Sequence, residues 1–192
     1  MAFTISNFKA KLANQAGGAR PALYEIDINS ISTALSFTAS ENLLVKTASI
    51  PAANIAPLAV NYAGRAYKWN GFRTYDNWTV TVINDESFSA RNKMMQWMRL
   101  MAGKFEGERN SAYGDQLVSG GFFDGDATVK QLSTSGSVVQ VYKFHYLWPT
   151  EVAGIPLDWS SDAIQEYTIT FAYDYWTHGS GASSSTNVVS ST

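Results

Sequence analysis

Apolar and polar residues alternate along much of this chain, and the alternation predicts β-strands. Residues 75–83, YDNWTVTVI, place Trp78, Val80 and Val82 on one face and polar side chains on the other. Because successive side chains of a strand point to opposite faces of a sheet, this pattern predicts a strand with one buried face. The same period recurs in three further segments: residues 21–28; residues 137–148, with Val138, Tyr142, Phe144, Tyr146 and Trp148 on one face; and residues 163–175, with Tyr167, Ile169, Phe171, Tyr173 and Tyr175 on one face.

Shorter segments and turn residues complete the strand pattern. Residues 43–50 predict a further strand, and residues 56–69 predict a hairpin whose turn lies within residues 61–64. Asn and Gly in that turn tolerate the positive φ angles that tight hairpins need. Residues 29–42 are rich in small polar side chains and residues 103–127 are rich in glycine, so both are expected to be irregular connections.

Helical spacing is confined to two segments. The stronger one predicts a helix over about residues 85–102, with Asn84 or Asp85 as its N-terminal cap. The other predicts a short helix near the N-terminus that ends at the glycine pair 17–18. The side chains that define the two helical faces are Met94, Trp97, Met98 and Met101 in the first, and Ile5, Phe8 and Leu12 in the second.

These elements together predict a mainly β single domain, a sandwich or barrel with one substantial helix. We divide the chain into an N-terminal arm (1–19), a β domain (20–177) and a flexible Gly/Ser-rich tail (178–192). The core is expected to bury Trp78, Val80, Val82, Trp97, Phe144 and Phe171.

Composition narrows the range of functions. Charged residues make up only 16% of the 192 residues, against a usual share of about 25%, and aromatic residues make up 14%. Few charges and many aromatics are typical of surfaces that a partner covers, although a β-rich core accounts for them equally well. The net charge of −2 argues against a protein that grips nucleic acid through its phosphates. We expect no disulfide because the chain has no cysteine, and no signal peptide or membrane anchor.

No constellation of residues predicts catalysis, cofactor binding or metal binding. His145 and His178 are far apart and lack metal-ligand spacing. The segment Asp124–Gly125–Asp126 lacks the further oxygen ligands of a calcium loop. The chain is therefore not expected to be an enzyme.

Two longer motifs resemble a known family. Residues 71–103 read GFRTYDNWTVTVINDESFSARNKMMQWMRLMAG, and residues 147–176 read LWPTEVAGIPLDWSSDAIQEYTITFAYDYW. Both resemble the tail tube proteins of contractile-tailed bacteriophages. In that family a G-x-R-T-[FY]-x-x-W-T-V-T-V-x-N-D-E stretch leads into the helix, and a W-P-T-x-[VI] turn precedes the last long strand. The resemblance touches most of residues 19–176; the chain departs from the family most at 103–136 and in its Ser-rich tail.

The resemblance implies a structural virion protein of the tail, made in the bacterial host cytoplasm. Its β-sandwich subunits would close into hexameric rings and stack into a tube, with a fold similar to the type VI secretion tube protein. The implied partners are further copies of the chain, the tail sheath protein, the baseplate and tail-terminator proteins, and DNA that passes through the lumen without specific binding. No cofactor is implied, and residues 1–19 and 29–42 are expected to become ordered through contacts with neighbouring subunits.

A lumen that faces water and DNA should be polar, and either uncharged or acidic, because lysine and arginine would hold the phosphates back. Two polar strand faces fit this description, and the alternative is that these faces point outward to the sheath. The residues expected to face the lumen are Asn77, Thr79, Thr81, Glu166, Thr168, Thr170 and Asp174.

Three other functions stay open at this point. A tube subunit of a phage-derived contractile injection or secretion system would share the fold. A carbohydrate-binding β-sandwich would use exposed Trp and Tyr side chains as its platform. An enzyme would need a cleft that contains carboxylates with perturbed pKa values.

Overall fold

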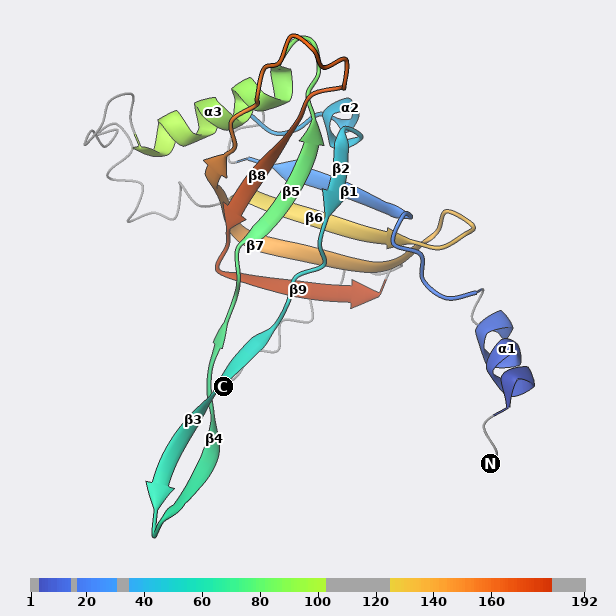
Figure 1. The fold of residues 1–192 in the computed structure, drawn as a ribbon, viewed down its shortest axis with the longest axis vertical. Coiled ribbons are helices and arrows are strands. Elements are labelled where there is room, and N and C mark those ends of the chain that lie inside the picture. Colours follow the sequence, from blue (N-terminus) through green and yellow to red (C-terminus); the bar gives the residue numbers. More distant parts are fainter. Residues whose placement is uncertain (1–3, 15–16, 31–34, 103–124, 181–192) are drawn as a thin grey trace.

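The strands form one antiparallel sheet that folds over on itself, and a separate hairpin projects from it (Figure 1). The structure is a computed structural model that describes residues 4–14, 17–30, 35–102 and 125–180. The elements in chain order are α1 (Ile5–Asn14), β1 (Tyr24–Asn29), α2 (Ala39–Asn42), β2 (Val45–Ala48), β3 (Asn54–Tyr62), β4 (Arg65–Thr74), β5 (Trp78–Ile83), α3 (Ser89–Ala102), β6 (Gly125–Leu132), β7 (Val138–Val152), β8 (Glu166–Ala172) and β9 (Tyr175–Ser180).

The long strand β7 connects the two halves of the sheet. The strand order is β1-β6-β7-β8-β5-β2, and β9 pairs with the first half of β7. The second half of β7, from Trp148 onward, pairs with β8. In Figure 1 the strands β1, β6 and β9 run across the direction of β5 and β8. The mainly β sandwich predicted from the sequence is confirmed.

A β-bulge lets β7 turn from one half of the sheet to the other. Ala127 pairs with Phe144, but Gly125 pairs with Leu147, so β7 carries one extra residue opposite β6. Tyr146 within this bulge has a φ of 56°. A one-residue insertion moves all later side chains to the opposite face. The predicted face of residues 137–148 is therefore wrong beyond Phe144: Tyr146 is exposed and Leu147 is buried.

Aromatic side chains fill the space between the two halves. The Trp78 ring stacks on Phe144 with centroids 4.5 Å apart and contacts Phe171 at 5.6 Å. Helix α3 covers one open end of the core with buried Met94 and Trp97. The six side chains predicted to form the core, Trp78, Val80, Val82, Trp97, Phe144 and Phe171, are all buried, which confirms the assigned strand faces at those positions.

Three boundaries differ from the prediction. Helix α3 begins at Ser89 and not near residue 85, because Phe88 has a φ of 54° and Asp85 instead accepts a hydrogen bond from the Ser89 amide (3.2 Å). The strand predicted over residues 163–175 is shorter in the structure: β8 runs from Glu166 to Ala172, and Tyr175 already belongs to β9. The expected tail begins too early, since residues 178–180 belong to β9; the rest of the tail lies outside the described residues.

Two expected loops contain packed structure. Strand β6 lies between β1 and β7, in a stretch where the sequence predicted no strand. The expected loop at residues 29–42 also contains packed structure. Leu35 and Phe37 are buried in the core of the same subunit, and α2 carries a capping box between Thr38 and Glu41. Part of residues 29–42 is therefore ordered by this subunit alone. Most of the expected loop at 103–127 lies outside the described residues.

Gly125 has no space for a side chain, and replacing it with alanine should test the bulge. A Cβ atom there would press on the Leu147 carbonyl oxygen and the Trp97 ring, closer than an ordinary contact. We expect Gly125→Ala to lower the free energy of unfolding by about 2–3 kcal/mol, as overpacking does elsewhere. Gly154→Ala is the matched control, because a Cβ there meets nothing within 4 Å. Equal urea midpoints for the two variants would contradict the tight packing.

Candidate functional site

Strand pairing gathers most of the predicted lumen residues on one face of the sheet. Strands β5 and β8 are antiparallel neighbours, and their core-facing side chains alternate with polar ones. The cross-strand partners on this face are Thr79 with Thr170, Thr81 with Thr168, and the apolar Ile83 with Glu166. Asn77 and Asp174 lie in the segments that flank these strands and are exposed. We call the surface formed by Thr79, Thr81, Thr168 and Thr170 the threonine face.

The threonine face is hydrophilic and carries little charge. Strand β2 extends it with Thr47, opposite Thr81. At its border Lys46 forms an ion pair with Glu166 (Nζ to Oε1, 2.6 Å), and both side chains are partly exposed. β-Branched side chains have few rotamers, so the hydroxyl groups are held in a regular array. Lys46 and Thr47 were not predicted, because pairing between β2 and β5 is not visible in the sequence.

The other half of the sheet has an outer face of a different character. Lys130 of β6 contacts Asp27 (2.7 Å) and Glu25 (3.5 Å) of β1. The hydrogen bond to Asp27 raises the pKa of Lys130 above its ordinary value. Lys143 of β7 pairs with Asp126 (2.6 Å). This face therefore carries both signs of charge in ion pairs, and the threonine face is the less charged of the two.

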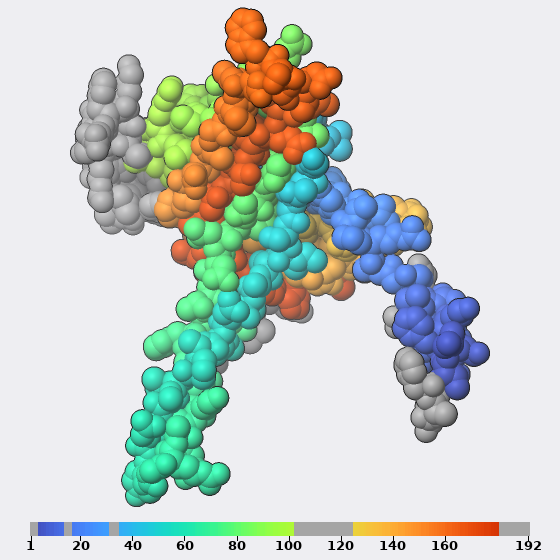
Figure 2. Space-filling model, viewed as in Figure 1, coloured from blue at the N-terminus to red at the C-terminus, as the bar shows by residue number. Residues whose placement is uncertain are grey.

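The β3–β4 hairpin exposes apolar side chains to solvent. It forms a two-stranded sheet of its own, with a turn in which Ala63 and Gly64 both have positive φ. It extends far from the rest of the subunit (Figure 2). Such a pair of strands is marginally stable by itself, so this surface is suited to being covered. Its exposed large apolar side chains are Ile55, Leu58, Val60, Tyr62, Tyr67, Trp69 and Phe72.

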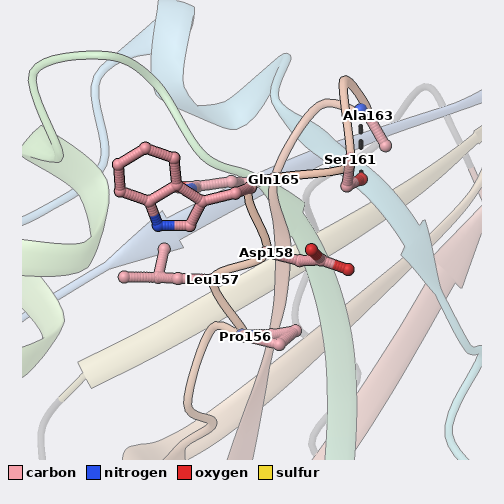
Figure 3. A pocket seen from close by; sticks show the side chains of 7 residues that line it. Pro156, Leu157, Asp158, Ser161, Ala163 and Gln165 are labelled. Carbon is pink, nitrogen blue, oxygen red and sulfur yellow. Dashed lines mark hydrogen bonds between the residues drawn. The ribbon is translucent and has the colours of Figure 1, made fainter.

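The connection between β7 and β8, residues 153–165, is the second exposed apolar region. Leu157 is 82% exposed and Trp159 fully exposed, and Ile164 is also exposed. A shallow hollow of about 410 Å³ lies among these loop residues, with Leu157 and Asp158 pointing in different directions (Figure 3). Asp158 holds the loop by accepting a hydrogen bond from the Ser160 amide (2.9 Å). The sequence did not single out this loop, since exposure of apolar residues depends on the fold.

The two histidines lie on neighbouring strands, β7 and β9, and have different neighbours. His145 Nε2 lies 2.9 Å from the Thr177 hydroxyl and its ring stacks on Tyr175. Burial lowers the pKa of His145, which favours the neutral imidazole. His178 is exposed on β9. Among the residues that the structure describes, no three His, Cys, Asp or Glu side chains come together as a metal site.

No described helix is both long and apolar enough to cross a membrane.

Solved structures share this fold. The chain is similar to a chain of the anti-feeding prophage tube-terminating cap, with a TM-score of 0.60, 14% identity, and coverage of 85% of this chain and 92% of that one. A chain in the sheath/tube terminator of an extracellular contractile injection system also has a TM-score of 0.60, at 11% identity and coverage of 85% and 97%. The fold is therefore shared with a chain in each of these two structures.

Sequence comparison makes the assignment more specific. The family model for phage tail tube proteins matches residues 6–179. The chain is 32% identical over 162 residues to the tail tube protein gp19 of Enterobacteria phage T4, covering 82% of this chain and 90% of that protein. It is 23% identical over 173 residues to the tail tube protein of Serratia phage KSP90, covering 88% and 94%. The chain belongs to the phage tail tube protein family and is a structural component of the virion tail.

Proposed function

We propose that six copies of this chain close into a ring, and that the rings stack into a tail tube that conducts DNA during genome ejection. The observation that carries the proposal is the low-charge threonine face on a subunit with large exposed apolar projections. A ring built from neighbouring subunits covers sheet edges that would otherwise promote aggregation. Closure of six copies around one axis needs a head-to-tail contact between different surfaces of each subunit.

The proposed role is mechanical and does not include catalysis. The subunit would be made in the host cytoplasm and would contact the tail sheath, the baseplate and the tail terminator in the virion. DNA would pass without specific binding, because a lumen with few cations forms few phosphate contacts. Light scattering and negative-stain images of the purified chain test the assembly. A strict monomer at high concentration, with no rings or tubes, would contradict the proposal.

Added positive charge on the face of the seven predicted lumen residues tests whether that face lines the channel. We expect Thr79→Lys with Thr168→Lys to leave rings and tubes intact and to slow DNA ejection by about tenfold at low salt, because added cations bind phosphates. The slowing should weaken at high salt, where screening is stronger. Thr128→Lys, on the outer face of β6, is the matched control. If the double-lysine variant lost sheath attachment but ejected DNA at an unchanged rate, the threonine face would lie on the outside of the tube.

A second candidate is the inner tube of a phage-derived contractile injection system that passes protein instead of DNA. The fold similarity to chains in structures of such systems favours it. Purification of tubes with their natural contents distinguishes the two, since a protein cargo without DNA would support the second candidate.

A further inference from the structure

Asn70 is the only asparagine of this chain that is followed by a glycine. A backbone amide nitrogen can attack the side-chain carbonyl carbon of the asparagine before it, and the side chain of the attacking residue normally hinders that approach. Glycine has no side chain and has the widest choice of backbone angles. The pair formed by Asn70 and Gly71, which lies in β4, is therefore the place in this chain where such an attack meets the least steric hindrance.

The fold requires the glycine of this pair. A Cβ atom at residue 71 would collide with the Ala56 carbonyl oxygen of β3. The register of the hairpin shifts between Ile55 and Pro57, so Ala56 lies in a bulge opposite β4. Glycine within a strand often marks such a bulge or a close approach of another backbone. The geometry of the hairpin thus explains why a glycine follows Asn70.

The surroundings of Asn70 hold it weakly. Its side chain is exposed, and its cross-strand partner is Pro57, which has no N–H group to donate to β4. No hydrogen bond within the described part of the chain holds the Asn70 side chain. The Asn29 side chain in the main sheet, by contrast, donates a hydrogen bond to Asp126 (Nδ2 to Oδ1, 3.1 Å).

Ring closure needs a backbone rotation that an intact strand does not allow. The extended backbone keeps the Gly71 nitrogen away from the side-chain carbon of Asn70, so the chain must first leave the strand conformation at Asn70. The β3–β4 hairpin is a two-stranded sheet that stands apart from the main sheet (Figure 1). Such a ribbon is marginally stable, and segments of this kind open locally at little cost in free energy. The rotation at Asn70 therefore does not require the core to unfold.

We propose that Asn70 is a site of spontaneous deamidation in the free subunit, at a rate set by opening of the β3–β4 hairpin. The Gly71 amide gives its proton to a base in solvent, and its nitrogen bonds to the side-chain carbonyl carbon of Asn70. The side-chain amide group takes up a proton and leaves as ammonia, which closes a five-membered succinimide ring. Water then adds to either ring carbonyl and opens the ring to aspartate or isoaspartate. No oxidant, reductant or enzyme is needed.

The reaction changes both the charge and the pairing of the hairpin. Residues 54–74 contain Arg65, Lys68 and Arg73 and no aspartate or glutamate, so the product carries the first negative side chain of this segment. Isoaspartate also adds one methylene group to the main chain, which shifts the register of β4 opposite Pro57. Aged free subunits therefore differ from fresh ones in the part of the surface that projects furthest from the β domain.

Incubation of unassembled subunits in mildly alkaline buffer, with and without urea, tests the proposal. Peptide mass spectrometry gives the rate of amide loss at each asparagine. Asn29 is the matched control, because it is also exposed and is followed by the small Ser30, but it lies in the main sheet. The ratio of the rate in urea to the rate in the folded subunit isolates the effect of the fold, since each sequence is compared with itself.

We expect this ratio to be at least about tenfold smaller at Asn70 than at Asn29, which corresponds to a difference of about 1.4 kcal/mol in the protection that the fold gives. Equal ratios at the two positions, or no amide loss at Asn70 in the folded subunit, would overturn the proposal. Asn70→Gln keeps an amide but would have to close a larger ring, so the acidic species that ion exchange separates from fresh subunits should not accumulate in this variant. Their accumulation at an unchanged rate would show that they arise elsewhere.

Discussion

Trp78→Ala should lower the free energy of unfolding of the subunit by about 3–5 kcal/mol, the range for other buried aromatic side chains. Trp78 is 1% exposed and lies between Phe144 and Phe171 at the centre of the core. Its indole Nε1 also donates a hydrogen bond to the Ser49 carbonyl (2.8 Å). The substitution therefore removes ring contacts from both halves of the sheet and leaves a carbonyl without its donor. Urea unfolding of the unassembled subunit measures the loss.

Trp159→Ala is the matched control for that experiment. Trp159 is fully exposed, so the same chemical change should alter the free energy of unfolding by no more than about 0.5 kcal/mol, as for other surface positions. A loss for Trp78→Ala as small as that for Trp159→Ala would mean that the assigned face of β5 is reversed. Measurement on unassembled subunits is necessary because assembly of further copies could cover the exposed Trp159.

Glu41→Gln should have the second large effect on stability. The Glu41 side chain is buried and accepts hydrogen bonds from Lys93 Nζ (2.6 Å), the Ser89 hydroxyl (2.6 Å) and the Thr38 amide (2.7 Å). These bonds tie α2 to the start of α3. The substitution leaves the Lys93 charge without its partner in a half-buried place, which should cost about 2–3 kcal/mol. Glu166→Gln is the control, since its exposed ion pair with Lys46 should contribute at most about 1 kcal/mol.

The Glu41 carboxylate makes the stability of the subunit depend on pH in the acid range. Burial raises the pKa of Glu41, but the hydrogen bonds from Lys93, Ser89 and Thr38 outweigh burial and lower it from 4.5 to about 2. A lowered folded-state pKa means that the stabilisation is complete above the unfolded pKa and is lost as the pH falls toward the folded one. The difference corresponds to about 3 kcal/mol between pH 5 and pH 2. Glu41→Gln should flatten this part of the curve, and an unchanged acid dependence in that variant would refute the assignment.

The sequence predicted strands well where one face alternates without interruption. Trp78, Val80 and Val82 show this in β5, because each apolar residue meets the core and each intervening residue meets solvent. The prediction was wrong where the register shifts, as at Tyr146, since a bulge depends on the partner strand. It was also wrong at β6, whose short alternation, with Ala127 and Val129 facing inward, lies beside a glycine-rich stretch that suggested a loop.

The surfaces were harder to predict than the core. The threonines of β5 and β8 could be assigned to polar faces, but only their pairing shows that they form one surface. The sequence predicted the β3–β4 hairpin but not that it stands apart from the main sheet. The turn residues are the same in a hairpin that belongs to a larger sheet and in one that projects from it. The exposure of Trp159 could not be predicted either, since the sequence of a loop does not show whether a tryptophan in it is buried or exposed. Long-range packing, which determines these features, leaves no local pattern.

The isolation of the β3–β4 hairpin has a consequence for the kinetics of tube growth. A free two-stranded hairpin is only marginally stable, so any contact that covers it in the assembly includes the conformational entropy of ordering it. A single hairpin contact between two free subunits should therefore dissociate quickly. In the proposed tube, a ring of six copies that meets another ring would form its contacts together, and the later ones are intramolecular. Polymerisation should then show a lag before closed rings accumulate and rapid elongation afterwards, and adding preformed tube ends should abolish the lag.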